Sequence, residues 1–160
     1  MPNETDDANR RIRLTVSRSG TVLLVDEDCA RLQHYSAILQ AFGYQVEICA
    51  SYEGGVRRLD ADTLDFILVS QGSPNFEGRW GLERAIQIDR GLPVLVLARC
   101  LDMGCYLEAM QAGAVDYLAE PISVHDLLWA LETHLRPARK EPARRTASET
   151  EGLNPLRLFD

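Results

Sequence analysis

The sequence predicts an α/β protein in which a doubly wound parallel sheet carries helices on both faces. Five short apolar runs alternate with five segments whose apolar residues recur at helical spacing, a pattern typical of βα repeats. The runs are almost continuously hydrophobic, as strands covered on both faces must be. Residues 20–136 also form one stretch of single-domain size. We therefore expect one sheet built from all five runs.

Each predicted strand is a run of five or six residues rich in aliphatic side chains. In chain order, the predicted strands are Thr21–Val25, Gln45–Cys49, Asp65–Val69, Pro93–Ala98 and Ala114–Leu118. In an open parallel sheet, ligands bind beyond the carboxyl ends of the strands. The residues that follow these runs are therefore the candidates for a functional site.

The segments between the strands carry helix start and stop signals. The predicted helices are Cys29–Phe42, 51–60, Gly81–Asp89, Leu101–Ala112 and a last one that follows Ser123. The first ends at Gly43, since glycine readily takes the left-handed conformation found after a helix. In the last, Ser123 is the expected N-cap, and Asp126 three residues later completes a pair that resembles a capping box.

Charge is distributed unevenly along the chain. The formal net charge is −7, yet residues 21–136 hold seventeen acidic side chains and eight arginines, and residues 137–160 are slightly basic. Nucleic-acid affinity depends on Lys and Arg that displace phosphate counterions, so this acidic body argues against nucleic acid as a partner. Lys140 is the only lysine of the chain.

Two further classes of protein are disfavoured. No apolar run approaches the ~18 residues that span a bilayer, so we expect a cytoplasmic protein without a membrane contact. The four cysteines lack the paired spacing of a zinc site, and we expect reduced thiols and no cofactor.

Polar residues cluster where the predicted strands end. Asp26 and Glu27 follow the first strand, Ser70 follows the third, and Glu120 follows the fifth. Because the carboxyl ends of parallel strands share one edge of the sheet, we expect these side chains to line one crevice, together with Ala98 and Arg99 after the fourth strand. Adjacent carboxylates are ligands that suit Mg²⁺.

In order and spacing, three motifs resemble the receiver domain of bacterial response regulators, the phosphoacceptor half of two-component signalling. They are Val22-Leu23-Leu24-Val25-Asp26-Glu27-Asp28, then Asp65-Phe66-Ile67-Leu68-Val69-Ser70 with Pro74 following, and Asp116-Tyr117-Leu118-Ala119-Glu120-Pro121. The resemblance covers about residues 20–136. It implies a flavodoxin-like (βα)5 fold with strand order 2-1-3-4-5.

The resemblance also implies roles for single residues. Asp26 and Glu27 match the acidic pair that holds Mg²⁺ in the family, and Tyr117 matches its rotating aromatic switch. Pro121 matches the residue that follows a cis peptide bond. Three positions depart from the pattern: Ser70 stands in place of the phosphorylated aspartate, Ala98 in place of the switch threonine or serine, and Glu120 in place of a lysine.

The departures remove the chemistry that the family uses. A serine hydroxyl needs a base to act as a nucleophile, and all three histidines, His34, His125 and His134, belong to predicted helices away from the strand ends. We therefore predict no phosphotransfer and no other enzymatic activity. Residual Mg²⁺ binding at Asp26 and Glu27 is expected to be weak, because the third ligand is a neutral hydroxyl.

Glu120 adds a negative charge to a pocket that is already acidic. Like charges within ~4–6 Å disfavour joint ionisation unless a cation compensates them. Arg99 lies one position after Ala98, at the end of the fourth strand. We predict that a salt bridge from Arg99 to Glu120 or Asp26 replaces the lost lysine–aspartate contact.

These observations favour a phosphorylation-independent pseudo-receiver that acts as a signalling or protein-interaction module. Its expected partners are proteins, among them a histidine kinase or an output protein, or a second copy bound through the fourth helix, fifth strand and fifth helix, about residues 101–135. Two alternatives remain. One is an atypical phosphorelay regulator controlled at Asp26 and Glu27, and the other is a sensor whose acidic crevice accepts a small ligand or cation, such as a polyamine-like molecule.

Three parts are expected along the chain. Residues 1–19 form a flexible N-terminal tail, residues 20–136 the receiver-like domain, and residues 137–160 a flexible C-terminal tail. The last segment has mixed charge and no sustained apolar period before Leu153, so it cannot bury enough apolar surface to fold alone.

Overall fold

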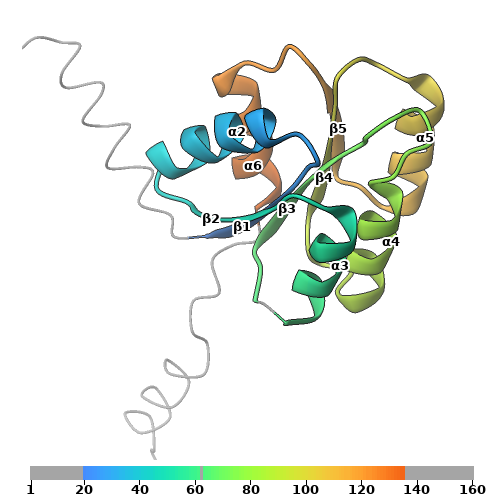
Figure 1. Cartoon of the computed structure of the whole chain (residues 1–160), viewed down its shortest axis with the longest axis horizontal. Helices are drawn as coiled ribbons and strands as arrows, with labels where there is room; N and C mark the ends of the chain where they lie inside the picture. Colours follow the sequence, from blue (N-terminus) through green and yellow to red (C-terminus); the bar gives the residue numbers. More distant parts are fainter. Residues whose placement is uncertain (1–19, 62, 136–160) are drawn as a thin grey trace, which may run out of the picture.

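A computed structural model describes residues 20–61 and 63–135. Five parallel strands form one sheet in the order β2-β1-β3-β4-β5 (Figure 1). They are β1 (Thr21–Val25), β2 (Gln45–Cys49), β3 (Phe66–Ser70), β4 (Val94–Ala98) and β5 (Asp116–Ala119). The predicted fold class and strand order are thus confirmed. The predicted tails, residues 1–19 and 137–160, lie outside the described residues.

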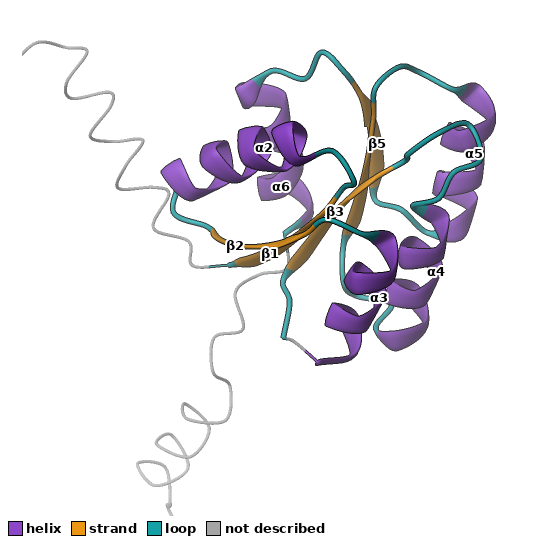
Figure 2. Cartoon of the chain, viewed as in Figure 1, coloured by secondary structure: helices purple, strands orange, loops and turns teal. Residues whose placement is uncertain are grey.

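Five helices cover the two faces of the sheet (Figure 2). They are α2 (Cys29–Ala41), α3 (Tyr52–Ala61), α4 (Arg79–Ile88), α5 (Met103–Ala112) and α6 (Val124–His134). Helices α2 and α6 lie on one face, and α3, α4 and α5 lie on the other (Figure 2). None of these helices combines the length and the apolar character needed to cross a bilayer.

The strands supply a core to each face because successive side chains point to opposite sides. In β1, Val22 and Leu24 pack toward α2 and α6, whereas Leu23 and Val25 pack toward α3 and α4. The central strands β3 and β4 are buried at every position. Burial on both faces accounts for their continuous hydrophobic runs.

Local capping signals set the helix ends. Ser123 caps α6 as predicted, since its hydroxyl accepts a hydrogen bond of 3.0 Å from the N–H of Asp126. Asp28 caps α2 and Asp102 caps α5 in the same way. Gly43, where the first helix was predicted to stop, has a φ of 93°, a left-handed conformation that glycine adopts without strain.

The observed boundaries differ from the predicted ones at a few places. Strand β3 begins one residue later than predicted, at Phe66, and includes Ser70, whereas α4 begins two residues earlier, at Arg79. Strand β2 is an edge strand with one neighbour, so its Gln45 and Ile48 are exposed. The expectation that every run is covered on both faces is therefore wrong for β2.

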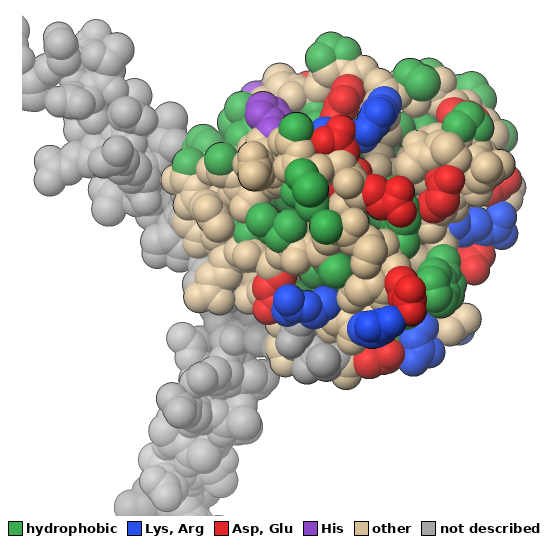
Figure 3. Space-filling view, viewed as in Figure 1, with side chains coloured by type: hydrophobic (Ala, Val, Ile, Leu, Met, Phe, Trp, Pro, Cys, Tyr) green, Lys and Arg blue, Asp and Glu red, His purple; other side chains and the backbone are tan. Residues whose placement is uncertain are grey.

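The surface carries many ion pairs between neighbouring side chains. Arg79 contacts both Glu83 and Glu108, and Arg84 contacts Asp60. Figure 3 shows acidic and basic side chains intermixed on one face, with hydrophobic side chains gathered between α2 and α3. Such exposed pairs contribute about 0–1 kcal/mol each, so the buried sheet and its helices dominate stability.

Candidate functional site

A cavity of about 600 Å³ opens at the carboxyl ends of β1, β3 and β4. Asp26 and Glu27 line it from the end of β1, Ser70 from the end of β3, and Arg99 from the end of β4. Four of the six residues proposed from the sequence therefore meet here. Ala98 is buried in the core instead, and Glu120 lines a neighbouring cavity of about 560 Å³ that also contains Arg99.

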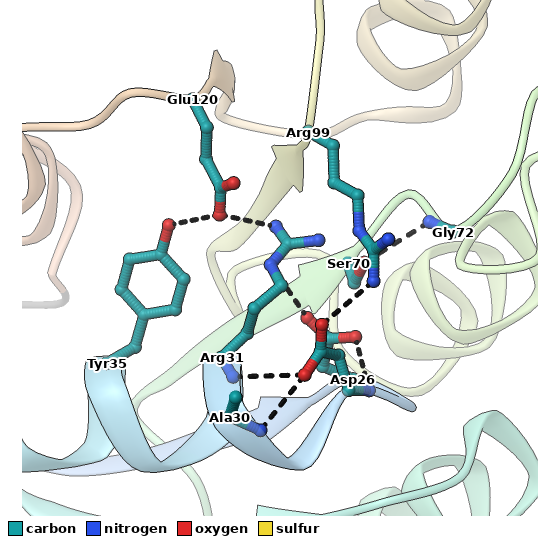
Figure 4. Close-up of polar contacts among 9 residues, drawn as sticks. Asp26, Ala30, Arg31, Tyr35, Ser70, Gly72, Arg99 and Glu120 are labelled. Carbon is teal, nitrogen blue, oxygen red and sulfur yellow. Dashed lines mark hydrogen bonds and ion pairs between the residues drawn. The ribbon is translucent and has the colours of Figure 1, made fainter.

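Arg31, in the first turn of α2, lies between two carboxylates (Figure 4). Its Nη2 is 2.8 Å from Oε1 of Glu120, and its Nε is 3.4 Å from Oδ2 of Asp26. Only 12% of the Arg31 side chain is exposed. The positive charge of Arg31 thus compensates the acidic groups at the ends of β1 and β5.

Tyr35 completes this arrangement one helical turn later. Its hydroxyl donates a hydrogen bond of 2.6 Å to Oε1 of Glu120, the same oxygen that faces Arg31. Burial and this hydrogen bond raise the pKa of Tyr35 to about 12. Side chains four residues apart share one face of a helix, so α2 presents Arg31 and Tyr35 together to Glu120.

The contacts of Arg31 are governed by charge more than by hydrogen-bond geometry. Its Nε and Nη2 are fully buried, yet neither makes a hydrogen bond to another described residue. Asp26, by contrast, accepts a hydrogen bond of 3.0 Å from the N–H of Asp28. A buried guanidinium held mainly by charge depends strongly on its carboxylate neighbours.

The prediction for Arg99 is wrong. Its Nη2 donates a hydrogen bond of 2.9 Å to Oδ2 of Asp28, and 64% of its side chain is exposed. Arg99 therefore extends over the loop after β1, while Arg31 holds the contacts with Glu120 and Asp26 that were assigned to Arg99. Sequence analysis missed Arg31, although its place five residues after Asp26 and four before Tyr35 was a usable signal.

Ser70 is held in the turn that follows β3. It is 3% exposed, and its Oγ accepts a hydrogen bond of 3.2 Å from the N–H of Gly72. Burial raises the pKa of the neighbouring Tyr52, and a hydrogen bond with Ser70 opposes this shift. The Ser70 hydroxyl is therefore part of the local hydrogen bonding of the turn.

The histidines lie on helices, as predicted, but His34 is closer to the site than expected. His34 lines the cavity that contains Arg31, Tyr35 and Glu120. It does not line the cavity that contains Ser70. The expectation that all three histidines lie away from the strand ends is thus wrong for His34, because α2 begins directly at that edge of the sheet.

Tyr117, the switch-like residue, points into the core from β5. Its hydroxyl donates a hydrogen bond to Oε1 of the buried Gln71 and accepts one of 3.3 Å from the N–H of Asp102. Burial raises the pKa of Tyr117. The sequence analysis did not single out Gln71. The peptide bond between Glu120 and Pro121 is cis, as the motif predicted.

The residues of the site fit a divalent cation poorly. Among residues 20–61 and 63–135, no three His, Cys, Asp or Glu side chains are placed to hold a metal ion together. One of the two candidate carboxylates, Asp26, already faces Arg31, and Ser70 is neutral. Weak Mg²⁺ binding at Asp26 and Glu27 stays a prediction.

Comparison of the sequence with known families and proteins gives one family. The model of the response regulator receiver domain matches residues 22–132. The transcriptional regulatory protein ZraR of Salmonella typhimurium is 25% identical over 122 residues, which cover 76% of this chain and 28% of ZraR. The response regulator protein TodT of Pseudomonas putida is 21% identical over 147 residues, 91% of this chain and 65% of TodT.

Solved structures agree with the fold. A CheY-like receiver domain protein from Methanospirillum hungatei has a TM-score of 0.68 and 27% sequence identity, and the match covers 72% of this chain and 93% of that protein. A response regulator from Chloroflexus aurantiacus has a TM-score of 0.67 and 26% identity over 73% of this chain and 98% of the other.

Proposed function

The chain belongs to the response regulator receiver domain family, and we propose that it is a pseudo-receiver, a protein-interaction module that signals without phosphorylation. Receiver domains connect histidine kinases with output domains, and they are generally signalling modules rather than enzymes. The chain spans less than a third of the length of ZraR. The match to ZraR therefore does not extend to the rest of that protein, and our proposal concerns the receiver domain.

The observation that carries the proposal is the position of Arg31. Its guanidinium contacts both Asp26 and Glu120, so these two carboxylates share the positive charge of a side chain of the protein itself. To bind here, a phosphoryl group or a metal ion would have to displace the guanidinium of Arg31 from these carboxylates. Ser70, held by the turn after β3, supports the same proposal because a hydroxyl cannot form an acyl phosphate.

The surface built by α5, β5 and α6 is the proposed protein-binding face, and a second copy is its proposed occupant. Large apolar side chains are exposed on α5, on the loop before it and on α6: Leu101, Met103, Leu107, Met110, Val124 and Trp129. Strand β5, at the edge of the sheet, lies between these two helices, and groups of large exposed apolar side chains are typical of a protein-binding site. The proposed homodimer would cover them.

An amide NMR titration tests phosphorylation independence. The full chain is titrated with Mg²⁺ and then with beryllium fluoride, which mimics an aspartyl phosphate. We expect Mg²⁺ to shift the resonances of Asp26 and Glu27 only weakly, and beryllium fluoride to leave those of Ser70 and Tyr117 unchanged. The control is the Ser70→Asp/Glu120→Lys double variant, which restores the charges that the resemblance implies. Coordinated shifts of these residues in the unmodified chain would show that the pocket still switches.

One observation favours a second function, that of a cation sensor. The larger cavity is lined by five carboxylates, Asp26, Glu27, Asp28, Glu77 and Asp102, and one arginine, Arg99. Hydrogen bonds from Ser73 lower the pKa of Glu77. Calorimetric titration with spermidine at low and at high salt tests this function. Saturable binding that survives at high salt would favour the sensor.

A further inference from the structure

The hydroxyl of Tyr117 is anchored on two sides. It donates a hydrogen bond to Gln71 and accepts one from the backbone of Asp102. Tyr117 is 5% exposed, and its ring meets that of Tyr106 edge to face with ring centroids 5.6 Å apart. Rotation of Tyr117 out of the core would break both hydrogen bonds and expose the ring.

Gln71 is itself fixed in place. It is 5% exposed, and its Nε2 donates a hydrogen bond of 3.3 Å to the carbonyl of Ser73. Its backbone N–H donates to the carbonyl of Leu97 at 2.8 Å, and its carbonyl accepts from Gly78 at 3.2 Å. A buried amide whose donor and acceptor are both paired cannot turn without leaving polar groups unsatisfied.

Asp102 transmits this anchoring to α5. Its side chain caps the helix by accepting a hydrogen bond of 3.0 Å from the N–H of Cys105, while its own N–H donates to Tyr117. Leu101 and Met103, on either side of Asp102, are exposed. The network therefore ends at the N-cap of α5, between two exposed apolar side chains.

We propose that Gln71 is a positioning residue that holds Tyr117 inward and, through Asp102, fixes the start of α5. The α5–β5–α6 surface then keeps one conformation without a phosphoryl group. Ala98, at the end of β4, offers no hydroxyl for this purpose, and Gln71 supplies the polar contact from the turn that follows β3 instead. The inference rests on the proposed function, since it explains how a fixed surface is maintained when no phosphorylation occurs.

The experiment follows Tyr117 in the full chain by ¹⁹F NMR after 3-fluorotyrosine is incorporated at all five tyrosines. Tyr117→Phe assigns the resonance. In Gln71→Leu, which keeps a similar volume but removes the side-chain amide, we expect this resonance to shift or split. Tyr117 also accepts the hydrogen bond of the Asp102 N–H. Loss of the hydrogen bond between Gln71 and Tyr117 should therefore speed amide hydrogen exchange at Asp102 by about tenfold. Gln33→Leu, at an exposed position of α2 on the other face, is the matched control and should change neither.

Two outcomes would overturn the inference. One is a folded Gln71→Leu variant with an unchanged Tyr117 resonance and unchanged exchange at Asp102, which would mean that packing alone holds the ring. If Gln71→Leu does not fold, Tyr117→Phe takes its place, and unchanged exchange at Asp102 in that variant also contradicts the network. Failure of the proposed function looks different, because the unmodified chain would then respond to beryllium fluoride.

Discussion

Arg31 supplies the positive charge that the two carboxylates of Asp26 and Glu120 share. Removing one partner of a buried ion pair leaves the others uncompensated, and this costs about 3–5 kcal/mol in a fully dry site. The Arg31 side chain is 12% exposed and Glu120 is 29% exposed, so solvent reduces the cost. We expect Arg31→Leu to lower the free energy of unfolding by about 2–3 kcal/mol, measured by urea denaturation.

Arg99→Leu is the matched control for this prediction. Arg99 also pairs with an aspartate, but its side chain is 64% exposed, and exposed pairs contribute about 0–1 kcal/mol. Its effect should therefore be less than half that of Arg31→Leu. A double-mutant cycle between Arg31 and Glu120 should give a stabilising coupling energy. Equal effects of the two leucine substitutions would contradict the central place of Arg31.

The raised pKa of Tyr35 should make the stability of the fold depend on pH in the alkaline range. Its pKa rises from 10.0 to about 12 in the folded chain, so the unfolded chain loses this proton at lower pH. The stability that Tyr35 contributes is complete below pH 10 and falls as the pH rises from 10 to 12. Tyr35→Phe removes this contribution and should flatten the fall in melting temperature over that range.

Absorbance at 295 nm provides the measurement for Tyr35. In the folded chain, one group that titrates near pH 12 should disappear in Tyr35→Phe. Burial also raises the pKa of Tyr52 and of Tyr117, so Tyr52→Phe and Tyr117→Phe are the comparisons that separate the three signals. A Tyr35→Phe variant that keeps the full high-pH titration would show that Glu120 does not hold this hydroxyl.

At the scale of the elements, the junction between β3 and α4 leaves no room for a side chain at Gly78. A Cβ built on Gly78 would lie 2.1 Å from the backbone oxygen of Ser70, and overpacking of this kind costs about 1–3 kcal/mol. The φ of Gly78 is −66°, so backbone strain plays no part. We expect Gly78→Ala to destabilise the protein and to shift the amide resonances of Ser70 and Gln71.

Gly81 offers the control on the same helix. A Cβ there would meet Val69 at an ordinary contact distance of 4.0 Å, and alanine favours a helix over glycine by about 0.8–1.0 kcal/mol. Gly81→Ala should therefore leave the melting temperature unchanged or raise it. A similar loss of stability in both alanine variants would mean that the close approach to Ser70 is not the cause.

For the whole molecule, the proposed homodimer predicts a concentration-dependent mass. Sedimentation velocity should show association that Leu107→Asp abolishes, because a charge would enter the exposed apolar surface of α5. Leu107 is 52% exposed, so the fold should tolerate the change. Ile48→Asp is the control, since Ile48 is 42% exposed on the opposite edge strand β2. If the chain stays monomeric at all concentrations, a second copy does not bind the α5–β5–α6 surface.

Much of the architecture could be read from local pattern. The apolar runs and the helical spacing located all ten elements, with boundaries wrong by one or two residues. Ser123 was recognised as an N-cap because capping depends on neighbours along the chain. The pocket was located because parallel strands end at a common edge, and Asp26, Glu27, Ser70 and Arg99 do line one cavity.

The sequence by itself determined the fold and the neighbourhood of the site, since periodicity and strand ends are properties of short segments. Only the tertiary structure decided which charges meet. Arg31 rather than Arg99 contacts Asp26 and Glu120, and Gln71 meets Tyr117 across 46 positions of the sequence. Long side chains choose partners by their direction and reach in three dimensions, and the spacing of residues along the chain does not record either.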